Sequence, residues 1–122
     1  IAGNATLRNL ALAHNAIVDV SALGDALRFN TAMDRLDFAM NGIVDVTTFG
    51  EALKTNTTLT WLCLSFNKIR DVSKLGEALK VNRTLVHLDL KPVRNREKKE
   101  KGPGGVVVVV VVFVVGLCRS RC

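Results

Sequence analysis

The chain is organised around residues 59–69, which read L-T-W-L-C-L-S-F-N-K-I. The corresponding stretch 26 positions earlier, residues 33–43, reads M-D-R-L-D-F-A-M-N-G-I, and residues 7–17 read L-R-N-L-A-L-A-H-N-A-I. Residues 85–90 begin the same pattern again as L-V-H-L-D-L, and the match ends there. A fixed period of roughly 20 to 50 residues indicates a protein built from stacked structural repeats.

The first half of each repeat predicts a short strand. Apolar and variable residues alternate there, which is the pattern of a strand with one buried face. An asparagine follows the strand at a constant offset, and an isoleucine lies two positions further on. The predicted strands are centred on residues 10–12, 36–38 and 62–64, the asparagines are Asn15, Asn41 and Asn67, and the isoleucines are Ile17, Ile43 and Ile69.

The second half of each repeat predicts a helix of about two turns. In residues 19–30, D-V-S-A-L-G-D-A-L-R-F-N, the side chains of Leu23, Ala26 and Leu27 share one helical face. We expect a hydroxyl residue at the N-cap, an acidic residue in the first turn, a basic residue in the last turn and a left-handed asparagine at the end. In that order, these are Ser21, Thr47 and Ser73; Asp25, Glu51 and Glu77; Arg28, Lys54 and Lys80; and Asn30, Asn56 and Asn82.

Two further positions recur for which the repeat suggests a structural reason. Aspartates precede each predicted helix and are expected to cap or brace the loop there. Glycines lie inside the helices, where each costs up to about 1 kcal/mol relative to alanine. Their recurrence predicts close packing of neighbouring helices. The aspartates are Asp19, Asp45 and Asp71, and the glycines are Gly24, Gly50 and Gly76.

The frame L-x-x-L-x-L-x-x-N-x-I resembles the leucine-rich repeat. The run G-E-A-L-K-x-N-x-T-L at residues 76–85 is similar to the ribonuclease-inhibitor-like class of that family, although the repeat of 26 residues is about two shorter than the usual form. The resemblance covers residues 1–90. It implies an α/β solenoid, a right-handed βα superhelix with parallel strands on the concave face and helices on the convex face.

The resemblance also implies an inward-facing asparagine ladder of Asn15, Asn41 and Asn67, whose amides bond the backbone of adjacent turns. Three full repeats plus partial ones are expected, starting near residues 7, 33, 59 and 85. Residues 1–6 align with the end of a repeat, which leaves open a fragment of a longer array or a first repeat with an open end.

Charge divides the chain into two parts. Residues 1–90 carry nine basic and nine acidic residues, so the net charge of +6 lies wholly in residues 91–122. A basic patch for nucleic acid is therefore not expected on the repeats. The three cysteines, Cys63, Cys118 and Cys122, are an odd number without framework spacing, which favours a reducing, intracellular and cytoplasmic location.

The variable positions of the strands supply the candidate binding residues. The single tryptophan, Trp61, falls where a side chain is expected to face solvent, and tryptophan and arginine are enriched at binding hot spots. The alternative is that Trp61 only shields an open edge of the solenoid. The predicted partner-binding set is Arg35, Asp37, Met40, Trp61, Cys63, Phe66, His87 and Asp89.

Catalytic, cofactor and metal sites are not expected. His14 and His87 fall on the first and fourth predicted strands, about 14 Å apart at roughly 4.8 Å per strand, too far to share one ion. Asp37 and Asp89 lie two strands apart, with no third group beside them. The G-P-G-G run at residues 102–105 lacks the lysine and hydroxyl residue of a phosphate-binding loop.

The sequence after the repeats leaves several alternatives open. Residues 91–105 read as a basic Gly/Pro linker and residues 106–122 as a poly-Val low-complexity tail. The tail is a terminus without a function, a strand that covers the end of the solenoid, or a membrane anchor over residues 106–118. That apolar run is short for a bilayer as a helix, while Cys118 and Cys122 are open to acylation.

The function predicted from these features is a non-enzymatic protein-interaction module that binds a protein partner through its concave face. The alternative is a membrane-attached adaptor, associated with the membrane through residues 106–118. The identity of the partner does not follow from the sequence.

Overall fold

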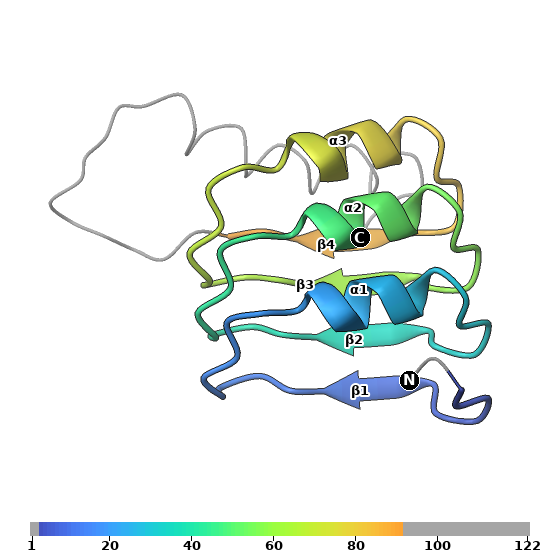
Figure 1. Cartoon of the computed structure of the whole chain (residues 1–122), viewed down its shortest axis with the longest axis horizontal. Helices are drawn as coiled ribbons and strands as arrows, with labels where there is room; N and C mark the ends of the chain where they lie inside the picture. Colours follow the sequence, from blue (N-terminus) through green and yellow to red (C-terminus); the bar gives the residue numbers. More distant parts are fainter. Residues whose placement is uncertain (1–2, 92–122) are drawn as a thin grey trace, which may run out of the picture.

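A computed structural model describes residues 3–91 of the chain. Short strands and helices alternate along these residues, so that each of the first three strands is followed by a helix and a return to the sheet (Figure 1). In chain order the elements are β1 (Asn9–Ala11), α1 (Ser21–Leu27), β2 (Arg35–Asp37), α2 (Thr47–Leu53), β3 (Trp61–Cys63), α3 (Ser73–Leu79) and β4 (His87–Asp89). The linker was predicted for residues 91–105 and the tail for residues 106–122, and of these only residue 91 lies within the described residues.

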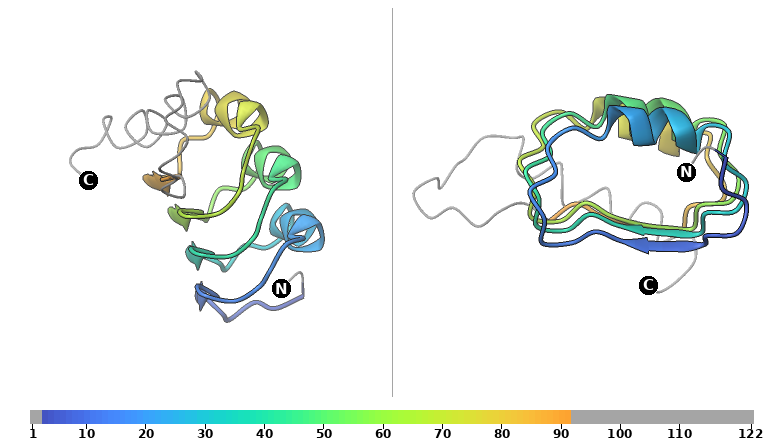
Figure 2. Two further views of the ribbon diagram at one scale, coloured as in Figure 1. Left: turned by 90° about the vertical axis from the view of Figure 1, so that its left-hand side faces the viewer. Right: turned by 60° about the horizontal axis from the view of Figure 1, so that its bottom comes forward.

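All the strands belong to one parallel sheet in the order β1-β2-β3-β4. Residues one repeat apart are direct partners, so Asn9 pairs with Arg35, Arg35 with Trp61, and Trp61 with His87. Figure 2 shows the strands on the inner side of a curved stack and the helices on its outer side. Because helices are wider than the spacing between strands, stacking them on one side bends the array in this direction.

The hydrophobic core lies between the sheet and the helices. Leu36 and Leu62 of β2 and β3 are fully buried, and the ring of Phe38 packs 5.8 Å from the ring of Phe49 in α2. The corresponding Leu10 of β1 is only partly buried. Leu88 of β4 is also fully buried, so burial is reduced only at the β1 end of the described sheet.

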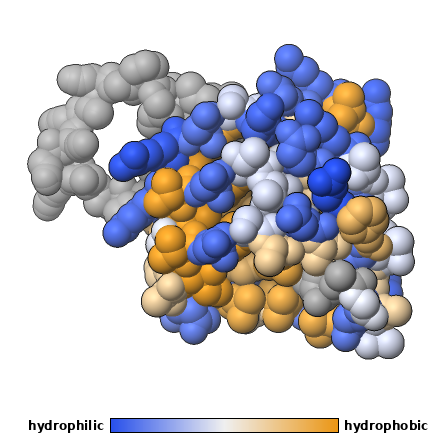
Figure 3. Space-filling model, in the orientation of Figure 1, coloured by the Kyte–Doolittle hydropathy of each residue, from blue (hydrophilic) through white to orange (hydrophobic). Residues whose placement is uncertain are grey.

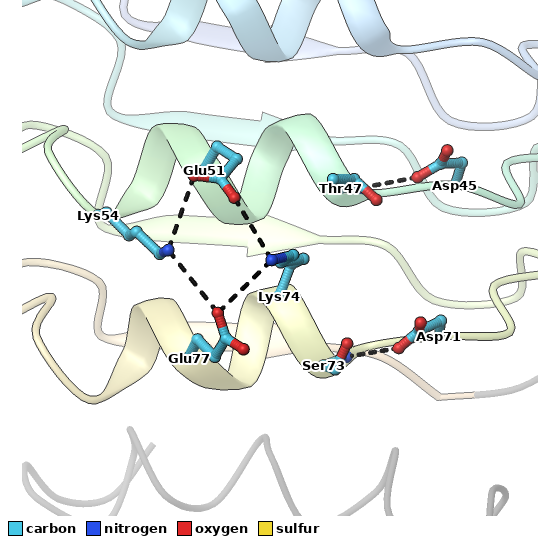
Figure 4. A network of polar contacts seen from close by, with 8 residues as sticks. All are labelled: Asp45, Thr47, Glu51, Lys54, Asp71, Ser73, Lys74 and Glu77. Atoms are coloured by element: carbon cyan, nitrogen blue, oxygen red, sulfur yellow. Dashed lines mark hydrogen bonds and ion pairs between the residues drawn. The ribbon is translucent and has the colours of Figure 1, made fainter.

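The structure corrects the predicted helix starts. Ser21, Thr47 and Ser73 are the first helical residues, and the N-cap residues before them are valines without a side-chain capping bond. The aspartate two positions before each helix takes that role: Oδ1 of Asp71 accepts a hydrogen bond from the N–H of Ser73 at 2.9 Å (Figure 4). These bonds stabilise the carboxylate form and lower the pKa values of Asp19, Asp45 and Asp71.

The charged residues also lie differently from the prediction. No acidic residue lies in the first turn and no basic residue in the last turn of α1, α2 or α3. Arg28, Lys54 and Lys80 follow the last helical residue instead. Lys54 and Lys74 form a network with Glu51 and Glu77 at 3.6–3.8 Å across α2 and α3 (Figure 4). Since these side chains are well exposed, each pair contributes at most about 1 kcal/mol.

The asparagines after the helices were expected to be left-handed, and this is wrong. They form a second ladder, in which Asn30 and Asn56 are buried and Asn82 is partly buried, because their amides connect successive repeats. Nδ2 of Asn56 donates to the carbonyls of Leu27 at 2.9 Å and Asn30 at 3.1 Å. Its Oδ1 accepts from the N–H groups of Thr58 at 2.9 Å and Leu59 at 2.8 Å.

The expectation that glycines permit close helix packing is confirmed for α1 and α2. A Cβ atom at Gly24 would overlap the hydroxyl of Thr48, and one at Gly50 would lie 2.6 Å from the Cβ of Lys74. Gly76 differs, because a Cβ there would meet no atom of residues 3–91 within 4 Å. Glycine is therefore required where a following described helix packs against it.

Candidate functional site

Three flat side chains form a continuous stack on the inner face of the sheet. The guanidinium Cζ of Arg35 lies 4.3 Å from the ring centroid of Trp61. On β4, the ring of His87 lies 5.1 Å from that of Trp61, with an angle of 7° between the planes. The strand spacing of about 4.8 Å sets this distance, since each strand contributes one group at the same level. We call Arg35, Trp61 and His87 the inner-face stack.

A shallow hollow adjoins the inner-face stack on the side of β1. It has a volume of about 190 Å³. It exists because β1 presents the short side chains of Asn9 and Ala11 at the level where the next strands present larger groups. The lining residues are Asn9, Leu10, Ala11, Arg35, Asp37 and Trp61. The sequence prediction omitted Asn9 and Ala11, although the small size of their side chains in an otherwise bulky column was a usable clue.

The second column of the inner face holds Asp37, Cys63 and Asp89 in direct register. Cys63 was expected to face solvent, and this is wrong, because its side chain is only 7% exposed. Its Sγ lies 3.4 Å from the hydroxyl of Ser65, which is itself buried. The thiol is smaller than the carboxylates on either side, and its burial raises the pKa of Cys63.

Asp89 is held in place at the end of this column. Its Oδ2 accepts a hydrogen bond from Nζ of Lys91 at 2.9 Å, and its Oδ1 accepts one from the N–H of Lys91. Partial burial would raise the pKa of Asp89, but hydrogen bonds from Ser65 and Lys91 outweigh it and leave that pKa below its usual value. The hydrogen bond to Asp89 and the negative charge of that carboxylate in turn raise the pKa of Lys91.

Met40 and Phe66 follow the strands, outside the inner-face stack. Both side chains are exposed, to 43% and 36%. Together with His14 they have a left-handed backbone, with φ near 60°. The strain at these non-glycine residues is offset by hydrogen bonds between repeats, such as the N–H of Met40 donating to the carbonyl of Ser65 at 2.9 Å.

The asparagines before the isoleucines link the turns that carry the inner face. Oδ1 of Asn41 accepts from the N–H groups of Asn15 at 3.1 Å and Ile17 at 3.0 Å. Nδ2 of Asn67 donates to the carbonyl of Phe38 at 2.9 Å. Within the described residues, the side-chain amide of Asn15 donates only to carbonyls of its own turn, those of Leu12 and Ala13, and this residue is exposed.

Apolar surface also lies outside the inner face. Figure 3 shows it along the β1 end and over the loops that follow the strands. A second hollow, of about 410 Å³, lies in those loops. Val18 and Val44 line it together with Asp19, Asp45, Ser21 and Thr48, and both valines are exposed, to 60% and 38%.

Within residues 3–91, no group of three His, Cys, Asp or Glu side chains is placed to hold a metal ion. None of the helices in that part of the chain is long and apolar enough to cross a bilayer. The segment 106–118, on which the membrane alternative rests, lies outside the described residues.

Comparisons with known proteins bear on the fold. No family model and no curated protein matches the chain. Among solved structures, actin-binding site 2 of leiomodin-1 is similar over 97% of this chain and 68% of its own length, with a TM-score of 0.69 and 21% identity. An internalin from Listeria monocytogenes matches over 76% of this chain and 30% of its own, with a TM-score of 0.49 and 23% identity.

At these identities the leiomodin-1 similarity concerns the fold alone. It agrees with the parallel sheet and with the helix that follows each of β1, β2 and β3. The chain therefore has an α/β repeat fold of the leucine-rich-repeat type.

Proposed function

We propose that residues 1–90 form a non-enzymatic leucine-rich-repeat domain of the ribonuclease-inhibitor-like class, which binds a protein partner through the inner face of its sheet. The observation that carries this proposal is the inner-face stack of Arg35, Trp61 and His87. The leiomodin-1 structure is named for actin binding, so a domain of this fold can serve as a protein-binding site.

The stack has the properties of a binding hot spot. Binding costs side-chain entropy, and a side chain already held in one position has less entropy to lose. Trp61 is held between Arg35 and His87, and it is half-buried, so part of its surface remains available. Tryptophan and arginine are the residue types most enriched among hot spots.

The proposed contact surface extends from the stack to its neighbours. Asp37 and Asp89 would provide charged groups beside it, with Asp89 already paired to Lys91. Met40 and Phe66 would add exposed apolar contacts at the loops that follow the strands. Cys63 would contribute to the floor of this surface rather than to direct contact, because it is buried.

The test compares the full chain with Trp61→Ala and Phe29→Ala. Phe29 is a matched aromatic control, since it is 74% exposed but lies in the turn after α1. Partners would be captured quantitatively with all three proteins, and the affinity of each purified partner would then be measured by calorimetry. We expect Trp61→Ala to weaken binding by about 2 kcal/mol or more, which is roughly 30-fold, and Phe29→Ala to leave it unchanged.

Trp61 is partly buried, so folding of Trp61→Ala must be checked by urea unfolding. If this variant folds and binds every captured partner as tightly as the wild type, the inner face is not the binding surface. Arg35→Ala provides a second variant in the stack, because Arg35 is exposed and its loss disturbs the core less.

A further inference from the structure

We propose that the hollow beside Arg35 receives an aromatic side chain of the protein partner, which stacks on the face of the guanidinium that is turned away from Trp61. This inference rests on the proposed function and specifies the chemistry of its central contact. The partner would thereby extend the inner-face stack by one group, from three to four.

The first argument is the register of the sheet. Asn9, Arg35, Trp61 and His87 are direct neighbours on successive strands. Cζ of Arg35 lies over the ring of Trp61, and the rings of Trp61 and His87 are stacked, while Asn9 presents a short amide. The position above β1 is thus the one place in this column without a large planar group. The hollow of about 190 Å³ lies there, with Asn9 and Arg35 both in its wall.

The second argument is charge. The wall of the hollow contains a cation, Arg35, and an anion, Asp37, on the same strand. A carboxylate entering the hollow would approach Asp37, and an ammonium group would approach Arg35, so neither sign of charge is favoured. A neutral aromatic ring avoids both penalties. Its π face attracts the guanidinium, and arginine stacks on aromatic rings more readily than lysine does.

The third argument is the apolar floor. The methyl group of Ala11 on β1 is exposed and contributes to the hollow, whereas the side chain of Leu10 packs against the core on the other face of the sheet. A ring seated above Ala11 would cover apolar surface that the chain leaves accessible, which adds a favourable hydrophobic contribution. An aliphatic side chain would gain this contribution as well, but it would not gain the stacking on Arg35. The difference in affinity between an aromatic and an aliphatic side chain therefore measures the stacking on Arg35.

The test titrates the full chain with two peptides, acetyl-Gly-Tyr-Gly-amide and acetyl-Gly-Leu-Gly-amide. Binding would be followed by NMR at the side-chain N–H resonances of Arg35 and Trp61. An exposed cation–π contact corresponds to a preference of about two- to fivefold for the tyrosine peptide. Arg35→Gln should abolish that preference, and Phe29→Ala, with its change in the turn after α1, should preserve it.

Asn9→Phe provides a test that does not depend on peptide affinity. Asn9 is exposed, so a phenyl ring there is expected to fold into the hollow, shift the Arg35 resonances and block the tyrosine peptide. Equal binding of the two peptides, or a preference that survives Arg35→Gln, would overturn the inference. If the peptides fail in this way while partner binding still depends on Trp61, only this inference falls and the proposed function stands.

Discussion

A Cβ atom at Gly50 in α2 would lie 2.6 Å from the Cβ of Lys74 in α3, whereas the equivalent atom at Gly76 in α3 would meet none of the described residues within 4 Å. The same glycine thus recurs in two different environments. At Gly50 it allows the neighbouring helix to approach. At Gly76 the described residues place no such helix against it, so only the conformational cost of glycine remains.

This contrast predicts opposite effects of one substitution. Gly50→Ala should destabilise the protein by about 1–3 kcal/mol, because α2 and α3 must move apart. Gly76→Ala should stabilise it by up to about 1 kcal/mol, because alanine is the better helix former. Urea unfolding of both variants measures the difference. If both substitutions change the free energy of unfolding in the same direction, the close approach of α2 and α3 does not explain the glycine at position 50.

The asparagine ladder supplies a second matched pair. Asn67 is 5% exposed, and its Nδ2 donates to the carbonyls of Phe38 and Leu64 at 2.9 and 3.1 Å. Asn67→Ala removes these bonds and the one that its Oδ1 accepts from the buried N–H of Ile43 at 3.0 Å, and it should cost about 1–3 kcal/mol or more. Asn15→Ala removes an exposed amide that bonds only its own turn, so its cost should be clearly smaller. If urea unfolding shows that both variants lose the same free energy of unfolding, hydrogen bonds between repeats do not have the stabilising role assigned to them.

Asp71 predicts a dependence of stability on pH. Its pKa is lowered by hydrogen bonds from the backbone and side chain of Ser73. The Asp71 carboxylate therefore contributes its full stabilisation above the unfolded-state pKa of about 3.9. This stabilisation is lost as the pH falls through the lower pKa of the folded state. Asp71→Ala should be less stable than the wild type at pH 7, and the difference should shrink toward pH 2. A difference that stays constant between these pH values would show that ionisation is not involved.

Cys63 predicts a difference in thiol reactivity. Because its thiol is buried and its pKa is raised, it should react with a thiol reagent much more slowly in the folded protein than in urea. The measurement requires the Cys118→Ser, Cys122→Ser background, which leaves one thiol in the chain. The same background with Cys63→Ser gives the blank. Rapid reaction in native buffer would mean that the second column of the inner face is open.

Local sequence determined the alternation of strands and helices. The alternating residues around Leu62 and the helical spacing of Leu75, Ala78 and Leu79 each define their element within a few residues, and the repeat places them again at the same interval. The tight approach at Gly50 was also foreseeable, because glycine inside a helix is costly and its recurrence needs a reason.

Contacts between repeats decided the features that the sequence missed. Asn56 lies at a helix end, where local rules favour a left-handed residue, but the carbonyls of the preceding repeat offer its amide better partners. The helix start is a local exception, because Oδ1 of Asp71 accepts a hydrogen bond from the N–H of Ser73, only two residues further along the chain.

The candidate site shows the same division. The sequence by itself determined that Arg35, Trp61 and His87 occupy one column of the sheet, because they lie one period apart. Only the tertiary structure decided that they stack, that Cys63 is buried beside them and that a hollow lies above β1. The physical reason is that a period specifies which residues are neighbours, whereas contact and burial depend on the sizes and rotamers of side chains from different strands.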